Sequence, residues 1–195
     1  YIVFADDEIY HVFNRGIEKR PTFTNKAELE RAMLALSLYR FSDLPIRLSK
    51  ILTLPVDERT QFIQNIYKEC KKLVEIISFC LMPNHFHFLL KQKMENGISI
   101  FTSNFTNSYT KYFNAKHERL GPLFQGLFKA VHITSDEQLL HVSRYIHLNP
   151  VTSYLIKPEQ LESYHWSSYL ECMGLSSEDI VEEKIVLDLI SIKKQ

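Results

Sequence analysis

The spacing of apolar and polar positions along this 195-residue chain predicts strands and helices that interleave. Alternation with a period of two, or a run rich in β-branched residues, predicts four strands, over 8–16, 74–81, 85–93 and 127–133. Apolar positions three and four residues apart predict helices over 25–40, 58–72, 98–117 and 135–149. The last of these is expected to end near Asn149, because Pro150 disfavours a helical conformation in the residue before it.

The remaining segments connect or follow these elements. The stretch 41–55 is expected to be an irregular connection, because Pro45 and Pro55 interrupt it. Two short helices are expected near 158–162 and 167–173, and an acidic amphipathic helix over 176–195. A single antiparallel sheet with helices packed mainly on one face accommodates this order of elements, so the predicted fold class is α+β.

Length and composition predict one domain with an appended tail. At 45% hydrophobic residues the chain is long enough for one sizeable core, which we assign to residues 1–174, followed by an acidic helical tail over 175–195. The three cysteines lack the spacing of a disulfide framework or a zinc ribbon, which favours a reducing cytoplasm. No run of 18 apolar residues is present, so no membrane span is expected.

The net charge of zero hides a segregation of charge along the chain. Residues 71–134 carry eight Lys and Arg against three acids, whereas residues 156–195 carry four basic and eight acidic side chains. A basic middle indicates a local surface for an anionic ligand, although ordinary solvated charge on helix faces would give the same pattern.

The segment MPNHFHFLL (82–90) places two histidines one residue apart within an apolar run. On a strand His85 and His87 point to the same face, while Phe86 and Phe88 point to the other. A pair of imidazoles can begin a divalent-metal site. Alternatively, the two histidines occupy the polar face of a half-buried strand.

The helix over 135–149 ends in the segment RYIHLNP (144–150). Tyr145 and Asn149 are four residues apart and share a helical face, with His141 one turn earlier. A tyrosine hydroxyl can attack phosphorus when a bound Mg²⁺ or Mn²⁺ polarises the phosphate, and an amide oxygen can be a ligand of that metal. Alternatively, Tyr145 is a core aromatic residue and Asn149 ends the helix before Pro150.

Together these segments resemble the single-tyrosine transposases of the HUH class, most of all the branch associated with repetitive extragenic palindromes. The resemblance covers about residues 10–169 and rests on MPNHFHFLL, RLGPLFQG followed by LFKA, YIHLNPV, WSSY and the opening YHVFNRG. It implies a ferredoxin-like antiparallel sheet, the HUH nuclease fold, with His85, His87 and Asn149 as ligands of Mg²⁺ or Mn²⁺. It also implies that Tyr145 cleaves and rejoins single-stranded DNA at hairpins through a 5'-phosphotyrosine link, in a cytoplasmic, nucleoid-associated monomer or homodimer.

Other polar residues are candidates for a supporting role. His141 is a candidate to orient Tyr145 or accept its proton. Five basic side chains are candidates to hold phosphates: Arg15, Lys111, Lys116, Arg119 and Lys129. Aromatic residues of the helix over 98–117 are candidates to stack on bases or to pack in the core.

Two alternatives to a transposase remain open. The chain has Leu127 where the family usually has Arg, and its net charge is zero, which motivates a domesticated hairpin DNA-binding protein with little or no cleavage. The second alternative is a metallohydrolase in which Tyr145 only orients a water molecule. The connection over 41–68 and the tail after Gly174 also depart from the family pattern.

Overall fold

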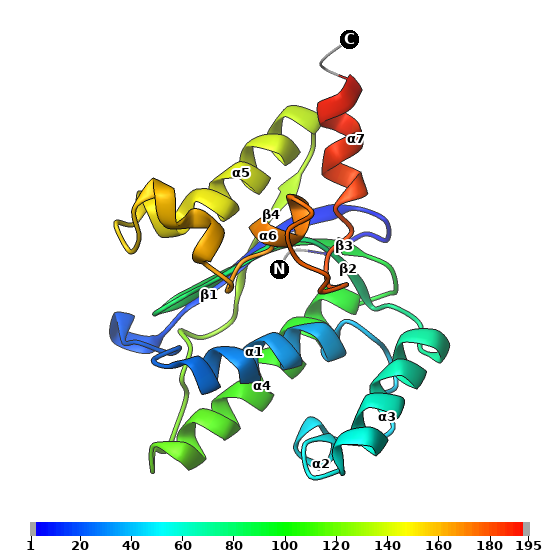
Figure 1. The fold of residues 1–195 in the computed structure, drawn as a ribbon, viewed down its shortest axis with the longest axis vertical. Helices are drawn as coiled ribbons and strands as arrows, with labels where there is room; N and C mark the ends of the chain where they lie inside the picture. The colour runs from blue at the N-terminus through cyan, green and yellow to red at the C-terminus, as the bar shows by residue number, and fades with distance from the viewer. Residues whose placement is uncertain (1–2, 193–195) are drawn as a thin grey trace.

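The computed structural model describes residues 3–192 and is built around one four-stranded sheet (Figure 1). All neighbouring strands are antiparallel, in the spatial order β2-β3-β1-β4. The strands are β1 (Ile9–Arg15), β2 (Val74–Met82), β3 (His85–Gln92) and β4 (Lys129–Ile133). All four predicted strands are present, and the predicted α+β class with an antiparallel sheet is confirmed.

Helices cover both faces of this sheet. On one face lie α1 (Lys26–Tyr39) and α4 (Gly97–Lys116), which enclose the larger part of the core; on the other lie α5 (Asp136–Thr152) and α7 (Lys184–Ile192) (Figure 1). The remaining elements are short or peripheral: η1 (Ile17–Lys19), α2 (Leu48–Ile51), α3 (Val56–Glu69), η2 (Pro158–Ser163) and α6 (Tyr169–Cys172). The connection predicted to be irregular therefore contains one helical turn, α2.

Alternation along β1 and β3 divides the sheet into two chemically different faces. Val12 pairs with Phe88, and both point into the core beneath α1 and α4 with no exposed surface. Phe13 pairs with His87 on the opposite face, beneath α5. One strand therefore supplies both the aromatic core and the histidine face.

Helix α5 begins at the capping residue that the sequence predicts, but it does not end where Pro150 was expected to end it. The Ser135 side chain accepts a hydrogen bond from the Gln138 N–H (3.2 Å) at the start of α5. The expected end near Asn149 is wrong, because α5 continues to Thr152 with Pro150 inside it. So close to the helix end, Pro150 costs one backbone hydrogen bond, and the Ser153 N–H still donates to the Asn149 carbonyl at 2.9 Å.

The segment 175–192 packs against the rest of the chain. Ile180 and Val181 are buried in the main core, and the Glu182 N–H donates to the Ile76 carbonyl on β2 (2.8 Å). Arg40 donates to the carbonyl oxygens of Asp179 (2.6 Å) and Ile180 (2.7 Å). The predicted terminal helix begins only at Lys184 as α7, and its expected last residues, 193–195, lie outside the described residues.

Candidate active site

A pocket of about 370 Å³ opens between the ends of β1 and β3 and the C-terminal half of α5. The residues that line it include His85, His87, Tyr145 and Asn149. The strand pair and the helix pair predicted from separate spacings therefore meet in one cavity.

The His85 ring is oriented by the residue before it in the turn. Its Nδ1 lies 2.6 Å from the Asn84 side-chain oxygen, which only accepts hydrogen bonds, so Nδ1 carries the proton. In the neutral ring Nε2 then keeps its lone pair. Burial lowers the pKa of His85, nearby Arg15 lowers it further, and a hydrogen bond with the Asn149 side chain opposes the shift. A neutral imidazole with a free lone pair is the form that binds metal ions.

His87 is the more buried of the two, with 6% of its surface exposed. Its Nδ1 lies 2.9 Å from Nε2 of His11, a residue on β1 that the sequence reasoning missed. Burial lowers the pKa of His87 to about 3, with smaller contributions from His11, His85 and Arg15, and burial lowers the pKa of His11 to about 4. Both rings are therefore neutral at pH 7, and one of these two nitrogen atoms donates to the other; when Nδ1 of His87 is the donor, its Nε2 is left as an acceptor.

Tyr145 and Asn149 project from one face of α5 toward these histidines. The Tyr145 ring is 43% exposed and meets the His87 ring edge-on, with the ring centroids 5.4 Å apart. The same ring lies 6.1 Å from that of His11, also edge-on. Asn149 is 3% exposed, and the Ser153 hydroxyl donates to its side-chain oxygen at 3.4 Å. Tyr145 therefore contacts His87 within its own chain and lines the same pocket as His85.

The donor atoms of this pocket fit a divalent metal ion. Two neutral imidazoles and one carboxamide form a mixed nitrogen and oxygen set that leaves room for phosphate oxygens and water. Within residues 3–192 no cluster of three or more His, Cys, Asp or Glu side chains could hold a metal ion. A metal in this pocket would therefore depend on the Asn149 amide as its third protein ligand.

The structure brings two of the five predicted basic residues to this pocket. Arg15 and Lys129 line it, and both are exposed. Lys111 lines a different pocket, beside α1 and α2. Lys116 forms an ion pair with Glu28 (3.0 Å), and Arg119 donates to the Asn114 side chain at 3.2 Å. His141 is exposed and is not among the residues that line the pocket.

The pocket wall also contains polar residues that the sequence reasoning did not select. Gln125 lies in the RLGPLFQG loop, and its N–H donates to the Arg15 carbonyl at 2.8 Å. Asn14 and Ser153 complete the wall. The signal that points to His11 is its register on β1, two residues before Phe13 on the face that carries His87. Gln125 gives no comparable signal, because a loop has no period.

No helix among residues 3–192 is both long enough and apolar enough to span a membrane. The chain shows no match among curated protein sequences. Its fold is similar to that of a REP-associated tyrosine transposase solved in complex with a REP hairpin, at a TM-score of 0.56 and 14% identity, covering 93% of this chain and 95% of the other. A tRNA(His) guanylyltransferase from Saccharomyces cerevisiae is a more distant structural match, with a TM-score of 0.41 and 12% identity over 96% of this chain and 79% of the other.

The model of the family described as "Transposase IS200 like" matches residues 39–149, which is more than half of the chain. This segment includes the histidine strand, the RLGPLFQG loop and most of the helix that carries Tyr145. The resemblance inferred from the motifs is thereby confirmed, and the chain belongs to the IS200-like transposase family.

Proposed function

We propose that this protein is a metal-dependent single-stranded DNA endonuclease and strand transferase that acts at hairpin DNA with Tyr145 as its nucleophile. The observation that carries the proposal is the edge-on contact between Tyr145 and His87, at a centroid distance of 5.4 Å, in a pocket that also contains Asn149. A nucleophile and a set of metal ligands side by side are the two parts that phosphoryl transfer to a side chain requires.

The pocket residues have different roles in the proposed reaction. His85, His87 and Asn149 would hold a divalent ion, Mg²⁺ or Mn²⁺, which supplies positive charge at the scissile phosphate. The Tyr145 oxygen attacks the phosphorus atom and loses its proton, and a bond forms between that oxygen and the 5' phosphate. The bond between phosphorus and the 3' oxygen breaks, and this oxygen leaves as a hydroxyl after taking up a proton. Attack by another 3' hydroxyl on the phosphotyrosine reverses these steps and joins two strands.

Two exposed cations at the pocket suit the DNA backbone. Arg15 and Lys129 line the cavity and sit at the same end of the sheet as the histidines. Positive side chains at a cleavage pocket position phosphates and offset the charge of the strand. Hairpin DNA is proposed as the substrate because the REP-associated transposase with the similar fold was solved bound to a REP hairpin.

Two other tyrosines, Tyr10 and Tyr164, are buried or hydrogen-bonded away from the pocket, which supports Tyr145 as the nucleophile. Tyr10 has 3% of its surface exposed, and the Tyr164 hydroxyl donates to the Leu81 carbonyl at 2.6 Å. Burial raises the pKa of Tyr164 far above its ordinary value, which suppresses its phenolate form. The 43% exposure of Tyr145 leaves its ring open to a strand.

The test is covalent capture of DNA. A hairpin oligonucleotide with single-stranded flanks is incubated with protein and Mg²⁺ or Mn²⁺, and the mixture is separated under denaturing conditions. We expect a protein–DNA adduct with the wild type and none with Tyr145→Phe. Tyr154→Phe is the matched control, because Tyr154 is 96% exposed, just beyond α5, and does not line the pocket. Equal adduct yields for wild type and Tyr145→Phe would refute the assignment.

One observation favours a second function, binding of hairpin DNA without cleavage. Leu127, which stands where the family usually has Arg, is 80% exposed two residues after Gln125 of the pocket wall. A strand passing this position would meet an apolar side chain where a cation would bind phosphate. Salt-dependent hairpin binding with no adduct under either metal would favour this function. Product released without attached protein would instead indicate a metallohydrolase in which Tyr145 only orients a water molecule.

A further inference from the structure

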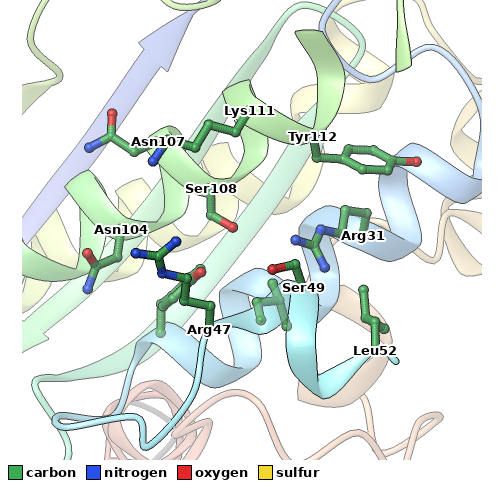
Figure 2. A pocket seen from close by; sticks show the side chains of 11 residues that line it. Arg31, Arg47, Ser49, Leu52, Asn104, Asn107, Ser108, Lys111 and Tyr112 are labelled. Carbon is green, nitrogen blue, oxygen red and sulfur yellow. The ribbon is translucent and has the colours of Figure 1, made fainter. Parts of the chain in front are cut away.

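A second polar pocket lies on the opposite side of the sheet from Tyr145, between α1, α2 and α4 (Figure 2). It has a volume of about 500 Å³, and its wall contains Arg31, Arg47 and Lys111 but no Asp or Glu. Figure 2 shows Arg31 from α1, Ser49 from α2 and Ser108 from α4 facing the same space. Three cations around a cavity without a carboxylate form an unbalanced cluster of positive charge.

Arg31 is the buried centre of this cluster. Only 9% of its surface is exposed, and its Nε and Nη1 atoms are buried without a hydrogen-bond partner. The guanidinium carbon lies 5.5 Å from the centre of the Tyr112 ring, so an aromatic face fixes one side of the group. Burial lowers the pKa of Arg31, whereas Tyr39 and Tyr112 oppose that shift. An arginine in this state remains charged, and its unpaired N–H groups are costly until an acceptor reaches them.

The other two cations are exposed and available. Within residues 3–192 neither Arg47 nor Lys111 lies within ion-pair distance of a carboxylate, and the same is true of Arg31. Arg47 also borders a neighbouring pocket whose wall includes Asp43 and Glu95, whereas no Asp or Glu lines the pocket that contains Arg31 and Lys111. The hydroxyl of Ser108 and the amide of Asn107 add neutral donors to the wall.

We propose that this pocket binds the phosphate group of a nucleotide-sized ligand, at a site separate from the cleavage pocket. Two guanidinium groups, an ammonium and hydroxyl donors around one cavity match the several acceptor oxygens of a phosphate. A volume of about 500 Å³ falls in the range of small-ligand pockets. The phosphate can come from a free nucleotide or from the 5' end of a DNA strand.

The test measures phosphate binding rather than DNA cleavage, so it stands apart from the function proposed for Tyr145. The probes are inorganic phosphate, a deoxynucleoside 5'-monophosphate, and one short oligonucleotide with and without a 5' phosphate. Binding is measured by calorimetry and by the shift in Tm at constant ionic strength, with chloride as the reference anion. We expect the wild type to bind the nucleotide and to gain thermal stability from it.

Arg31→Met removes the buried charge and keeps a side chain of similar length. We expect it to bind the nucleotide at least about tenfold more weakly, which corresponds to the loss of one charge-assisted contact. Without ligand its Tm should equal or exceed that of the wild type, because an unpaired buried charge is replaced by an apolar group. Lys50→Met is the matched control, since Lys50 is exposed on α2 but does not line the pocket, and its affinity should not change.

Lys111→Met tests the same site from an exposed position and keeps the proposal testable should Arg31→Met fail to fold. It should weaken binding severalfold without lowering the Tm of the unliganded protein. Preference for the phosphorylated oligonucleotide over the nucleotide identifies a strand end as the source, and comparable binding identifies a free nucleotide. The proposal is overturned if neither phosphate nor nucleotide binds the wild type, or if Arg31→Met and Lys111→Met bind as the wild type does.

Discussion

Glu171 on α6 holds the C-terminal segment to the domain through a partly buried carboxyl group. Its Oε1 atom accepts hydrogen bonds from the N–H groups of Ile180 (2.7 Å) and Val181 (2.8 Å). Burial raises the pKa of Glu171 to about 7; the two N–H donors lower it, and the acids Glu178 and Glu183 raise it. This carboxyl therefore titrates in the physiological pH range when the protein is folded.

The sign and size of the effect on stability follow from that pKa. A carboxyl whose folded-state pKa is raised binds its proton more tightly in the folded than in the unfolded protein. Its stabilising contribution is full below about pH 4.5 and is lost as the pH rises through about 7. At about 1.4 kcal/mol for each pH unit between these values, the loss in unfolding free energy is about 3 kcal/mol by pH 8.

Urea denaturation at pH 5 and pH 8 measures this loss directly. Glu171→Gln keeps an oxygen acceptor for both N–H groups but does not titrate, so at pH 8 it should be more stable than the wild type by about 3 kcal/mol. At pH 5 the two proteins should agree within about 1 kcal/mol. Glu162→Gln, a change at an exposed carboxyl on η2, is the control and should follow the wild type. The reasoning fails if Glu171→Gln and the wild type lose stability in parallel between the two pH values.

Three further substitutions test the site and its supports. His11→Phe keeps a ring beside Tyr145 but removes the partner of His87 Nδ1, so Mn²⁺ affinity measured by calorimetry should fall roughly 10–100-fold; an unchanged affinity would contradict the role of His11. Gly97→Ala would place a Cβ atom against the backbone carbonyl of residue 73, so urea denaturation should show a loss of about 1–3 kcal/mol, and an unchanged midpoint would count against this packing. Arg40→Met removes the donors to the carbonyls of residues 179 and 180, so amide hydrogens over 175–192 should exchange faster by mass spectrometry; unchanged exchange would mean that other contacts hold the segment.

The elements predicted best from the sequence are those in which the spacing of apolar residues matches the spacing of buried residues. In β1, Tyr10, Val12 and Asn14 are buried while His11 and Phe13 between them are partly exposed, so the alternation in the sequence corresponds directly to the two faces of the sheet. The end of α5 was predicted wrongly, because the rule for the residue before proline describes a local preference. Packing of Pro150, which is buried, and the hydrogen bonds beyond it carry the helix one more turn.

The core of the candidate site was predicted because each half has its own regular spacing. His85 and His87 are two residues apart on a strand, and Tyr145 and Asn149 are four apart on a helix, so each pair shares a face whatever the rest of the chain does. Whether the histidine face of the strand meets the Tyr145 face of the helix depends on the tertiary structure. The contact between His11 and His87 joins positions 76 residues apart, so local spacing could not reveal it.

Contacts made through backbone atoms left no pattern in the sequence. The C-terminal segment is held by Arg40 through the carbonyls of Asp179 and Ile180, and any residues at those two positions could supply the same acceptors. The pocket around Arg31 was missed for a related reason. It needs the single turn α2, and four residues are too few for a helical period to be visible.

Strand β3 supplies both aromatic core residues and the two histidines, so the geometry of the site depends on the register of this strand. Because side chains alternate, a slip of one residue would send Phe86 and Phe88 toward α5 and both histidines into the aromatic core. The Pro83–Asn84 turn resists such a slip through its own backbone: the Pro83 carbonyl accepts from the N–H groups of Thr22 (2.7 Å) and Phe23 (3.0 Å), and the Asn84 carbonyl accepts from Gly16 (2.8 Å). A Cβ atom at position 16 would clash with the backbone oxygen of residue 20, so the chain can come this close to position 16 only because that residue is glycine. The segment after β1 therefore fixes the register of β3, and with it the face on which the two histidines meet Tyr145.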